Sequence, residues 1–269
     1  MDQSIAKYRF LPAEALGQLQ PGRLWMSDPA SFNDPFDLRI RIGDETRHSP
    51  FADEERLRRA FRLLVQDNED VRRHWFYDDT LWAALHAWMD GRLSREEVID
   101  AANRRASCFG VACFAQHWDM PLMWAHYGDN HCGLCIEYAV QQDKLDAHAA
   151  REGFSQQYVQ YLTEMPTICF SEVLFSPHQV MSRLAATKHA DWAYEKEWRI
   201  IHFAAKARPV PLPRHMKMTG LIAGMQMAEE QCEALRSKGA ELGVPVRRVR
   251  RHTGNYQLQL EEISCRAEP

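Results

Sequence analysis

The sequence predicts an α+β protein whose core is a mixed, largely antiparallel sheet with an inserted helical block. Short apolar runs that suit strands recur from the beginning of the chain to its end, and a helical stretch occupies about residues 49–105. No Gly/Ser-rich linker or internal repeat divides the chain. We therefore expect a single domain over residues 1–269, with the helical block covering one side of the sheet.

The first forty residues alternate short apolar runs with turn residues. Residues 5–10 predict a strand, residues 12–19 a short helix that begins at a proline, and residues 23–27 a second strand after Gly22. The next segment, residues 28–37, is so rich in Pro, Asn and Asp that it predicts a loop built from turns. Loops of this kind often carry function.

The helical block is predicted to hold three helices. Ser49-Pro50 predicts the cap and first turn of the first helix, and residues 80–89 predict a second that stops at Gly91. The third is predicted to begin at Ser94, because Glu97 completes a Ser-x-x-Glu capping box. Three tryptophans are expected in a core rather than on a ligand-binding surface, namely Trp75, Trp82 and Trp88.

The rest of the chain predicts further strands and helices. Strands are expected at residues 107–115, 134–138, 219–224, 244–249 and 256–260, and at the end of residues 192–203. Helices are expected after a cap at Asp119 and at about residues 141–151, 176–188 and 228–238. In the strand that follows Trp192, Glu197 and Arg199 are expected on one face.

Composition limits the possible classes of protein. No run approaches the roughly 20 apolar residues of a membrane helix, and the N-terminus lacks a basic stretch followed by an apolar core. We expect a cytoplasmic protein that does not enter membranes, with its seven cysteines reduced. Cys132 and Cys135 lie in a predicted strand, where an offset of three sends their side chains to opposite faces, so we predict no metal site.

Several motifs spread along the chain carry a family resemblance. They are Tyr8-Arg9, Leu24-Trp25, Ser27-x-Pro29, Ser31–Asp37 (SFNDPFD), Met123–Tyr127 (MWAHY), Gly133–Tyr138 (GLCIEY) and Tyr194–Arg199 (YEKEWR). Taken together, from about residue 5 to 260, the chain resembles the bacterial family of unknown function numbered 2971. The resemblance implies a bacterial or phage protein and implies no particular activity.

The order of three residues also resembles ADP-ribosyltransferases of the Arg-Ser-Glu class. Arg9 lies on the first predicted strand, Ser27 ends the second, and a Glu-x-Glu pair, Glu195 and Glu197, precedes a late strand. The resemblance implies NAD as cofactor, with Arg9 on its diphosphate and Ser27 on a glutamate or the ribose. It implies that Glu197 stabilises the oxocarbenium-like ribose and that Glu195 positions the acceptor nucleophile.

Further residues are candidates for binding the cofactor: Tyr8, Asn33, Asp34, His126, Tyr127 and Arg199. Several of the candidates have a structural alternative. Arg9 either binds a ligand or pairs with Asp34 or Asp37, and Asn33 and Asp34 can be turn-formers.

For His126 the alternative is a satisfied core histidine. Glu197 and Arg199 can instead form an ion pair on the sheet surface.

Near the C-terminus, four arginines concentrate positive charge: Arg247, Arg248, Arg250 and Arg251. They either contact phosphate of a nucleic acid or another anionic partner, or they guard an edge strand against aggregation.

The leading hypothesis is an NAD-using ADP-ribosyltransferase-like enzyme of bacterial or phage conflict or stress response, with an unknown macromolecular acceptor. One alternative is a hydrolase or nuclease of a defence system that uses Asp34, His126 and either Glu137 or Glu197, with or without a metal. Another is a non-catalytic sensor in which the block at residues 49–105 recruits a partner protein.

Overall fold

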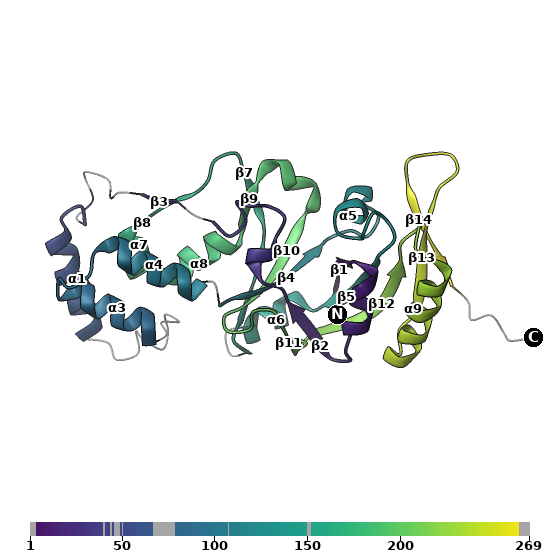
Figure 1. Cartoon of the computed structure of the whole chain (residues 1–269), viewed down its shortest axis with the longest axis horizontal. Coiled ribbons are helices and arrows are strands. Elements are labelled where there is room, and N and C mark those ends of the chain that lie inside the picture. The colour runs from purple at the N-terminus through teal and green to yellow at the C-terminus, as the bar shows by residue number, and fades with distance from the viewer. Residues whose placement is uncertain are drawn as a thin grey trace, which may run out of the picture.

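A single mixed sheet forms the core of the molecule, as the sequence predicted (Figure 1). The computed structural model describes residues 4–39, 41–43, 45, 49, 51–66, 79–106, 108–149 and 152–263. Within these ranges eight strands form the sheet, in the spatial order β14 (Leu258–Glu262), β13 (Val246–Arg251), β12 (Met216–Ala223), β5 (Leu134–Val140), β1 (Ile5–Leu11), β4 (Gly110–Ala115), β10 (Glu197–His202) and β6 (Phe154–Tyr158). Strands β12 and β13 pair in parallel, and the other neighbours are antiparallel.

Smaller elements surround the sheet. Two-stranded ladders join β2 (Arg23–Met26) to β11 (Arg208–Pro211), β3 (Arg41–Gly43) to β8 (Thr167–Cys169), and β7 (Gln160–Leu162) to β9 (Thr187–His189). The α-helices are α1 (Glu54–Gln66), α3 (Asp79–Met89), α4 (Arg95–Ala106), α5 (Pro121–His126), α6 (Gln142–Ala149), α7 (Phe170–Phe175), α8 (Pro177–Ala185) and α9 (Glu229–Leu242). The 3-10 helices are η1 (Ala13–Gln18), η2 (Pro29–Ser31) and η4 (Ala190–Glu195).

Both faces of the sheet are covered by other elements. Successive side chains of β1 point to opposite faces and so contact different covering elements. Phe10 of β1 packs against Trp124 of α5 with ring centroids 5.0 Å apart. The opposite face carries the larger apolar cluster, in which Phe114 and Trp198 pack with Leu145 of α6 and with residues of β2 and α9. Glu197 and Arg199 alternate with Trp198 and therefore lie on the α5 side of the sheet.

The helical block does not cover the sheet, which corrects our expectation. Helices α1, α3 and α4 pack around a core of their own, which includes Phe61 and Trp88 and which α7 completes with Phe170 (Figure 1). These helices bury their apolar stripes against one another, so little apolar surface remains for the sheet. Trp88 is fully buried as expected, Trp82 is half-buried, and Trp75 lies outside the described residues.

The predicted start of the helix at Ser94 is confirmed, whereas the predicted starts of α1 and α5 are wrong. Ser94 and Glu97 form the predicted capping box, with N–H to oxygen distances of 2.8 and 3.3 Å. Helix α1 begins only at Glu54, where Asp53 accepts a bond from the N–H of Arg56 at 3.0 Å, because the hydroxyl of Ser49 is used in a turn.

Helix α5 likewise lacks the predicted cap at Asp119. Met120 stands at its N-cap with no side-chain hydrogen bond, and Pro121 occupies the first turn. Proline needs no partner for a backbone N–H there, so the helix starts without a polar cap.

The sheet is split between β1 and β4. These strands pair at one position, Tyr8 opposite Ala115. At Val111 of β4 the neighbour is Ser27 instead of β1, and the two residues exchange backbone hydrogen bonds of 2.9 and 3.0 Å. Close approach requires a glycine at the start of β4, because a Cβ on Gly110 would lie 2.0 Å from the carbonyl oxygen of Ala205.

Three of the C-terminal arginines are engaged by acidic side chains. Arg247 lies 2.7 Å from Glu137, and Arg248 and Arg250 pair with Glu229 and Glu261 at 3.2 and 2.6 Å. Strand β13 lies between β12 and β14, so the interpretation that these arginines guard an edge strand is wrong, while phosphate contact stays a prediction.

The described helices include none with the length and apolar character that crossing a bilayer requires.

The buried Lys7 should make the stability of the protein depend on pH. Its side chain is buried on β1, where Nζ donates to the hydroxyl of Tyr158 at 2.9 Å, and it forms no ion pair with a described carboxylate. Burial lowers the pKa of Lys7 from 10.5 to about 8. Between these values the unfolded chain binds more protons than the folded chain, so the free energy of unfolding should rise with pH across this window.

Lys7→Met should therefore raise the free energy of unfolding at neutral pH and remove most of the rise between about pH 8 and 10.5. Urea unfolding at a series of pH values measures both effects. The exposed Lys217→Met serves as control and should retain the rise. Equal slopes in Lys7→Met and the unsubstituted protein would contradict the assignment.

Candidate functional site

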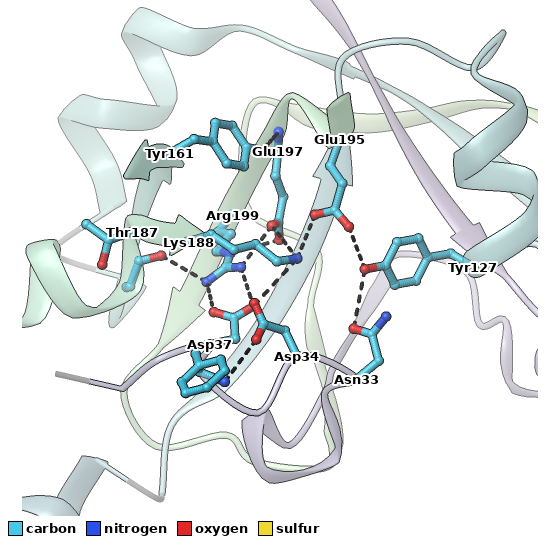
Figure 2. Close-up of polar contacts among 12 residues, drawn as sticks. Asn33, Asp34, Asp37, Tyr127, Tyr161, Thr187, Lys188, Glu195, Glu197 and Arg199 are labelled. Carbon is cyan, nitrogen blue, oxygen red and sulfur yellow. Dashed lines mark hydrogen bonds and ion pairs between the residues drawn. The ribbon is translucent and has the colours of Figure 1, made fainter. Parts of the chain in front are cut away.

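A buried guanidinium forms the centre of the polar cluster in Figure 2. Arg199 of β10 has no exposed surface and donates two bonds of 2.8 Å to Glu197. It donates two more, of 2.7 and 2.6 Å, to Asp37 in the loop after η2, and one of 3.2 Å to the carbonyl oxygen of Ala185. The ion pair that we considered for Glu197 and Arg199 is therefore present, and it is buried.

Lys188 adds a second buried cation that the sequence did not reveal. Its Nζ lies 2.6 Å from Glu195, 3.6 Å from Glu197 and 3.8 Å from Asp37. We had placed residue 188 at the end of a helix, but α8 ends at Ala185 and Lys188 lies in β9. No local pattern marks this lysine as buried, because the strand of three residues that carries it and the turn of η4 that brings Glu195 to it were not predicted.

Glu195 occupies the other side of the cluster. It ends η4 and is 2% exposed, and its Oε1 lies 2.6 Å from the hydroxyl of Tyr127, just after α5. That hydroxyl also lies 3.4 Å from Oδ1 of Asn33. Tyr127, Asn33 and Glu195, all sequence candidates, thus form one chain of contacts (Figure 2).

The two glutamates have different protonation behaviour because their neighbours differ. Burial by itself would raise the pKa of Glu197, but the charge and hydrogen bonds of Arg199 lower it to about 2. Burial is also the largest effect on Glu195, and there it raises the pKa despite the charge of Lys188. One carboxylate is therefore ionised at any ordinary pH, and the other holds a proton more readily.

A cleft of about 640 Å³ opens beside this cluster. It is lined by eight of our ten candidates, namely Tyr8, Arg9, Ser27, Asn33, His126, Tyr127, Glu195 and Glu197. The other two candidates, Asp34 and Arg199, are absent from its wall: Asp34 accepts a bond of 2.9 Å from the N–H of Phe36, as a turn-former does, and Arg199 is buried behind its carboxylates. Asp37, Cys113 and Lys188 line the cleft without having been proposed as ligand-binding residues.

Arg9 lacks the acidic partner that we had considered for it. Asp37 belongs to Arg199, while Arg9 donates to the carbonyl oxygen of Trp25 at 2.6 Å and to the hydroxyl of Ser27 at 3.5 Å. Arg9 is 6% exposed, and no carboxylate among the described residues forms an ion pair with it. A buried guanidinium without a counter-ion is costly, and an anionic ligand in the cleft would offset that cost.

Arg9 and Glu197 reach the cleft from opposite faces of the sheet. Arg9 lies over the ring of Phe114, 6.0 Å from its centroid, on the face of the larger apolar cluster. Glu197 pairs in register with Ala115 and projects to the α5 side. Both line one cavity because the sheet is split between β1 and β4.

His126 is an exposed residue at the wall of the cleft, which corrects the alternative of a core histidine. Its ring centroid lies 6.2 and 6.1 Å from those of Trp192 and Tyr194. Glu137, a candidate of the hydrolase alternative, instead bonds Tyr8, Thr219 and Arg247 and is absent from the wall of the cleft. Within the described ranges, no group of three or more His, Cys, Asp or Glu residues is arranged to hold a metal ion.

Comparison with known protein families finds a match over part of the chain. Residues 123–200 match the family described as a protein of unknown function, DUF2971. The match supports the resemblance over this segment, which carries Tyr127, Lys188, Glu195, Glu197 and Arg199. No curated protein and no solved structure matches the chain.

Removing the charge of Glu197 should destabilise the protein, because Arg199 would keep only one of its two carboxylate partners. We expect Glu197→Gln to lower the free energy of unfolding at neutral pH by about 3 kcal/mol. The pKa of Glu197 is depressed from 4.5 to about 2, so its contribution is present above 4.5 and is lost as pH falls towards 2. Urea unfolding across this pH range should show that the free energy of unfolding falls less with decreasing pH in Glu197→Gln than in the unsubstituted protein.

The exposed Glu164→Gln is the matched control and should behave like the unsubstituted protein. Equal stability of both variants at neutral pH would show that the cluster does not depend on the charge of Glu197.

Proposed function

We propose that this chain is an ADP-ribosyltransferase-like enzyme that binds NAD in the cleft. The observation that carries the proposal is Arg9, a buried guanidinium that lines the cleft without an ion-pair partner among the described residues. Its planar fork suits the NAD diphosphate, and the hydroxyl of Ser27 lies beside it.

The opposite part of the cleft suits the positive part of NAD. Glu195 and Glu197 line it together, and the pKa of Glu197 keeps that carboxylate charged at physiological pH. A fixed negative charge favours the oxocarbenium-like ribose that forms as nicotinamide leaves, since it needs no reorganisation during the reaction. Both oxygens of Glu197 are held by Arg199, so Glu197 would act through its charge while Glu195 contacts the ligand.

The size and wall of the cleft also suit a nucleotide. A volume of about 640 Å³ lies within the range, roughly 300 to 1,000 Å³, of known ligand pockets. Aromatic side chains of Tyr8, Phe32 and Phe114 contribute to its wall and offer surfaces for rings. The exposed His126 marks a side from which a macromolecular acceptor can approach.

The alternatives have less support. The hydrolase hypothesis needs Asp34 beside His126, but Asp34 is absent from the wall of the cleft. A non-catalytic sensor that recruits its partner through the helical block needs no ligand cleft, whereas the split sheet holds one. We further propose that the enzyme acts in bacterial or phage conflict or stress response.

Incubation with NAD labelled in its adenylate part, in the presence of a bacterial lysate, should transfer label to a macromolecule and release nicotinamide. Arg9→Met should weaken NAD binding at least tenfold, because it removes a charge-assisted contact to phosphate. Glu195→Gln should reduce nicotinamide release more than NAD affinity.

Arg251→Met, at an exposed arginine far along the chain, is the control for charge. Absence of NAD binding, of transfer and of nicotinamide release in the unsubstituted protein would refute the proposal.

A further inference from the structure

The contacts of Tyr127 raise a question of proton number. Its hydroxyl oxygen lies 2.6 Å from Oε1 of Glu195 and 3.4 Å from Oδ1 of Asn33. A phenol carries one proton, while an ionised carboxylate and an amide oxygen are both acceptors. With Oδ1 of Asn33 facing the phenol, as here, and Glu195 ionised, one proton would have to serve two acceptors. With Glu195 protonated, Glu195 donates to Tyr127 and Tyr127 donates to Asn33, so both contacts are hydrogen bonds.

The charges of the cluster lead to the same assignment. Among the described residues, the two cations Lys188 and Arg199 form ion pairs with three carboxyl groups, those of Asp37, Glu195 and Glu197, while the buried Asp34 beside them forms none (Figure 2). If all three paired carboxyl groups were ionised, this set of ion pairs would carry one excess negative charge, which burial disfavours. Asp37 and Glu197 each receive two bonds from Arg199, so Glu195 is the group that can take the proton at the lowest cost.

Other titratable groups lie near Glu195. Tyr161 of β7 accepts a bond from the N–H of Glu197 and donates to no carboxylate among the described residues, and Tyr194 precedes Glu195 in η4. Burial raises the pKa of both phenols, so they stay neutral. Arg9, His126 and Asp129 also line the cleft, and within the described ranges Arg9 forms no ion pair with a carboxyl group of the cluster.

We infer that Glu195 is a neutral carboxylic acid before a ligand binds and that it ionises when a cationic ligand enters the cleft. On ionisation the O–H bond of Glu195 breaks, the proton passes to solvent, and the hydroxyl of Tyr127 turns to donate to the new carboxylate. The carboxylate and the cationic ligand then form an ion pair. The protonation of Glu195 stands by itself, while the identity of the ligand rests on the proposed function.

The ionisation of Glu195 would allow the cleft to distinguish the oxidised from the reduced nicotinamide ring. The oxidised form carries a pyridinium cation, which favours ionised Glu195, whereas the reduced form is neutral and does not. The cleft should therefore prefer NAD over NADH, and binding of NAD should release a proton.

Titration of the ligand-free protein tests the protonation directly. With glutamate labelled by ¹³C at the carboxyl carbon, Glu195→Gln identifies the Glu195 signal, which should show a protonated carboxyl near neutral pH. Tyr127→Phe removes a hydrogen-bond partner that the hydroxyl offers to both forms of Glu195, so Glu195 should still titrate above its ordinary range in this variant. If Glu195 titrates in the ordinary range in the ligand-free protein, the inference is wrong.

Stability gives an independent readout. The amide of Glu195→Gln resembles the neutral acid, so this variant should keep the free energy of unfolding of the unsubstituted protein at neutral pH. Glu197→Gln replaces a charged carboxylate and should lower the free energy of unfolding at neutral pH. An equal loss in both variants would overturn the assignment.

Calorimetry with NAD and NADH, in two buffers of different ionisation enthalpy, tests the coupling. NAD should bind at least tenfold more tightly than NADH and release up to one proton, and Glu195→Gln should abolish the release. Binding of NAD without proton release would contradict the inference and leave the proposed function intact. Failure of NAD to bind would contradict the proposed function, and the titration would still decide the state of Glu195.

Discussion

The arrangement of the site depends on the burial of Arg199. A guanidinium with no exposed surface needs acceptors in its own plane, and here Asp37 and Glu197 supply them as two forks. Because Asp37 lies in the loop after η2, this requirement fixes the loop to β10. The loop in turn carries Asn33 to the wall of the cleft, where it meets Tyr127.

Arg9 is buried to a similar extent and has a different environment. Arg199 is neutralised within the protein, whereas Arg9 bonds only a carbonyl oxygen and a hydroxyl among the described residues. The split between β1 and β4 makes this second guanidinium part of a cleft, so a ligand can provide what the fold does not. The same opening brings it into one cavity with carboxylates from the other face of the sheet, and the cleft therefore suits a ligand with one negative and one positive part.

The three carboxyl groups of the cluster show how environment divides roles among like residues. Glu197 and Asp37 hold Arg199, and the low pKa of Glu197 follows from that contact. Glu195 contacts a phenol and an ammonium group. Its pKa is raised because the effect of burial is larger than that of the charge of Lys188. Pairs of carboxyl groups whose environments separate their pKa values are common where proteins perform acid–base chemistry. The proton that we propose on Glu195 agrees with this separation.

The sequence alone determined the α+β class, most of the strands, the capping box at Ser94 and the residue types of the cleft, because these depend on local periodicity and on turn chemistry. Eight of the ten predicted site residues line one cleft, since motifs near strand ends meet when the strands pair. Only the tertiary structure decided which cation pairs with which carboxylate. Asp37 could have served Arg9 or Arg199, because this ion pair joins segments more than a hundred residues apart. Lys188 gave no signal because its contact with Glu195 depends on how β9 and η4 fold against each other. The helical lobe was decided in the same way, since α7 joins it from a distant part of the chain and completes a core that no local pattern specifies.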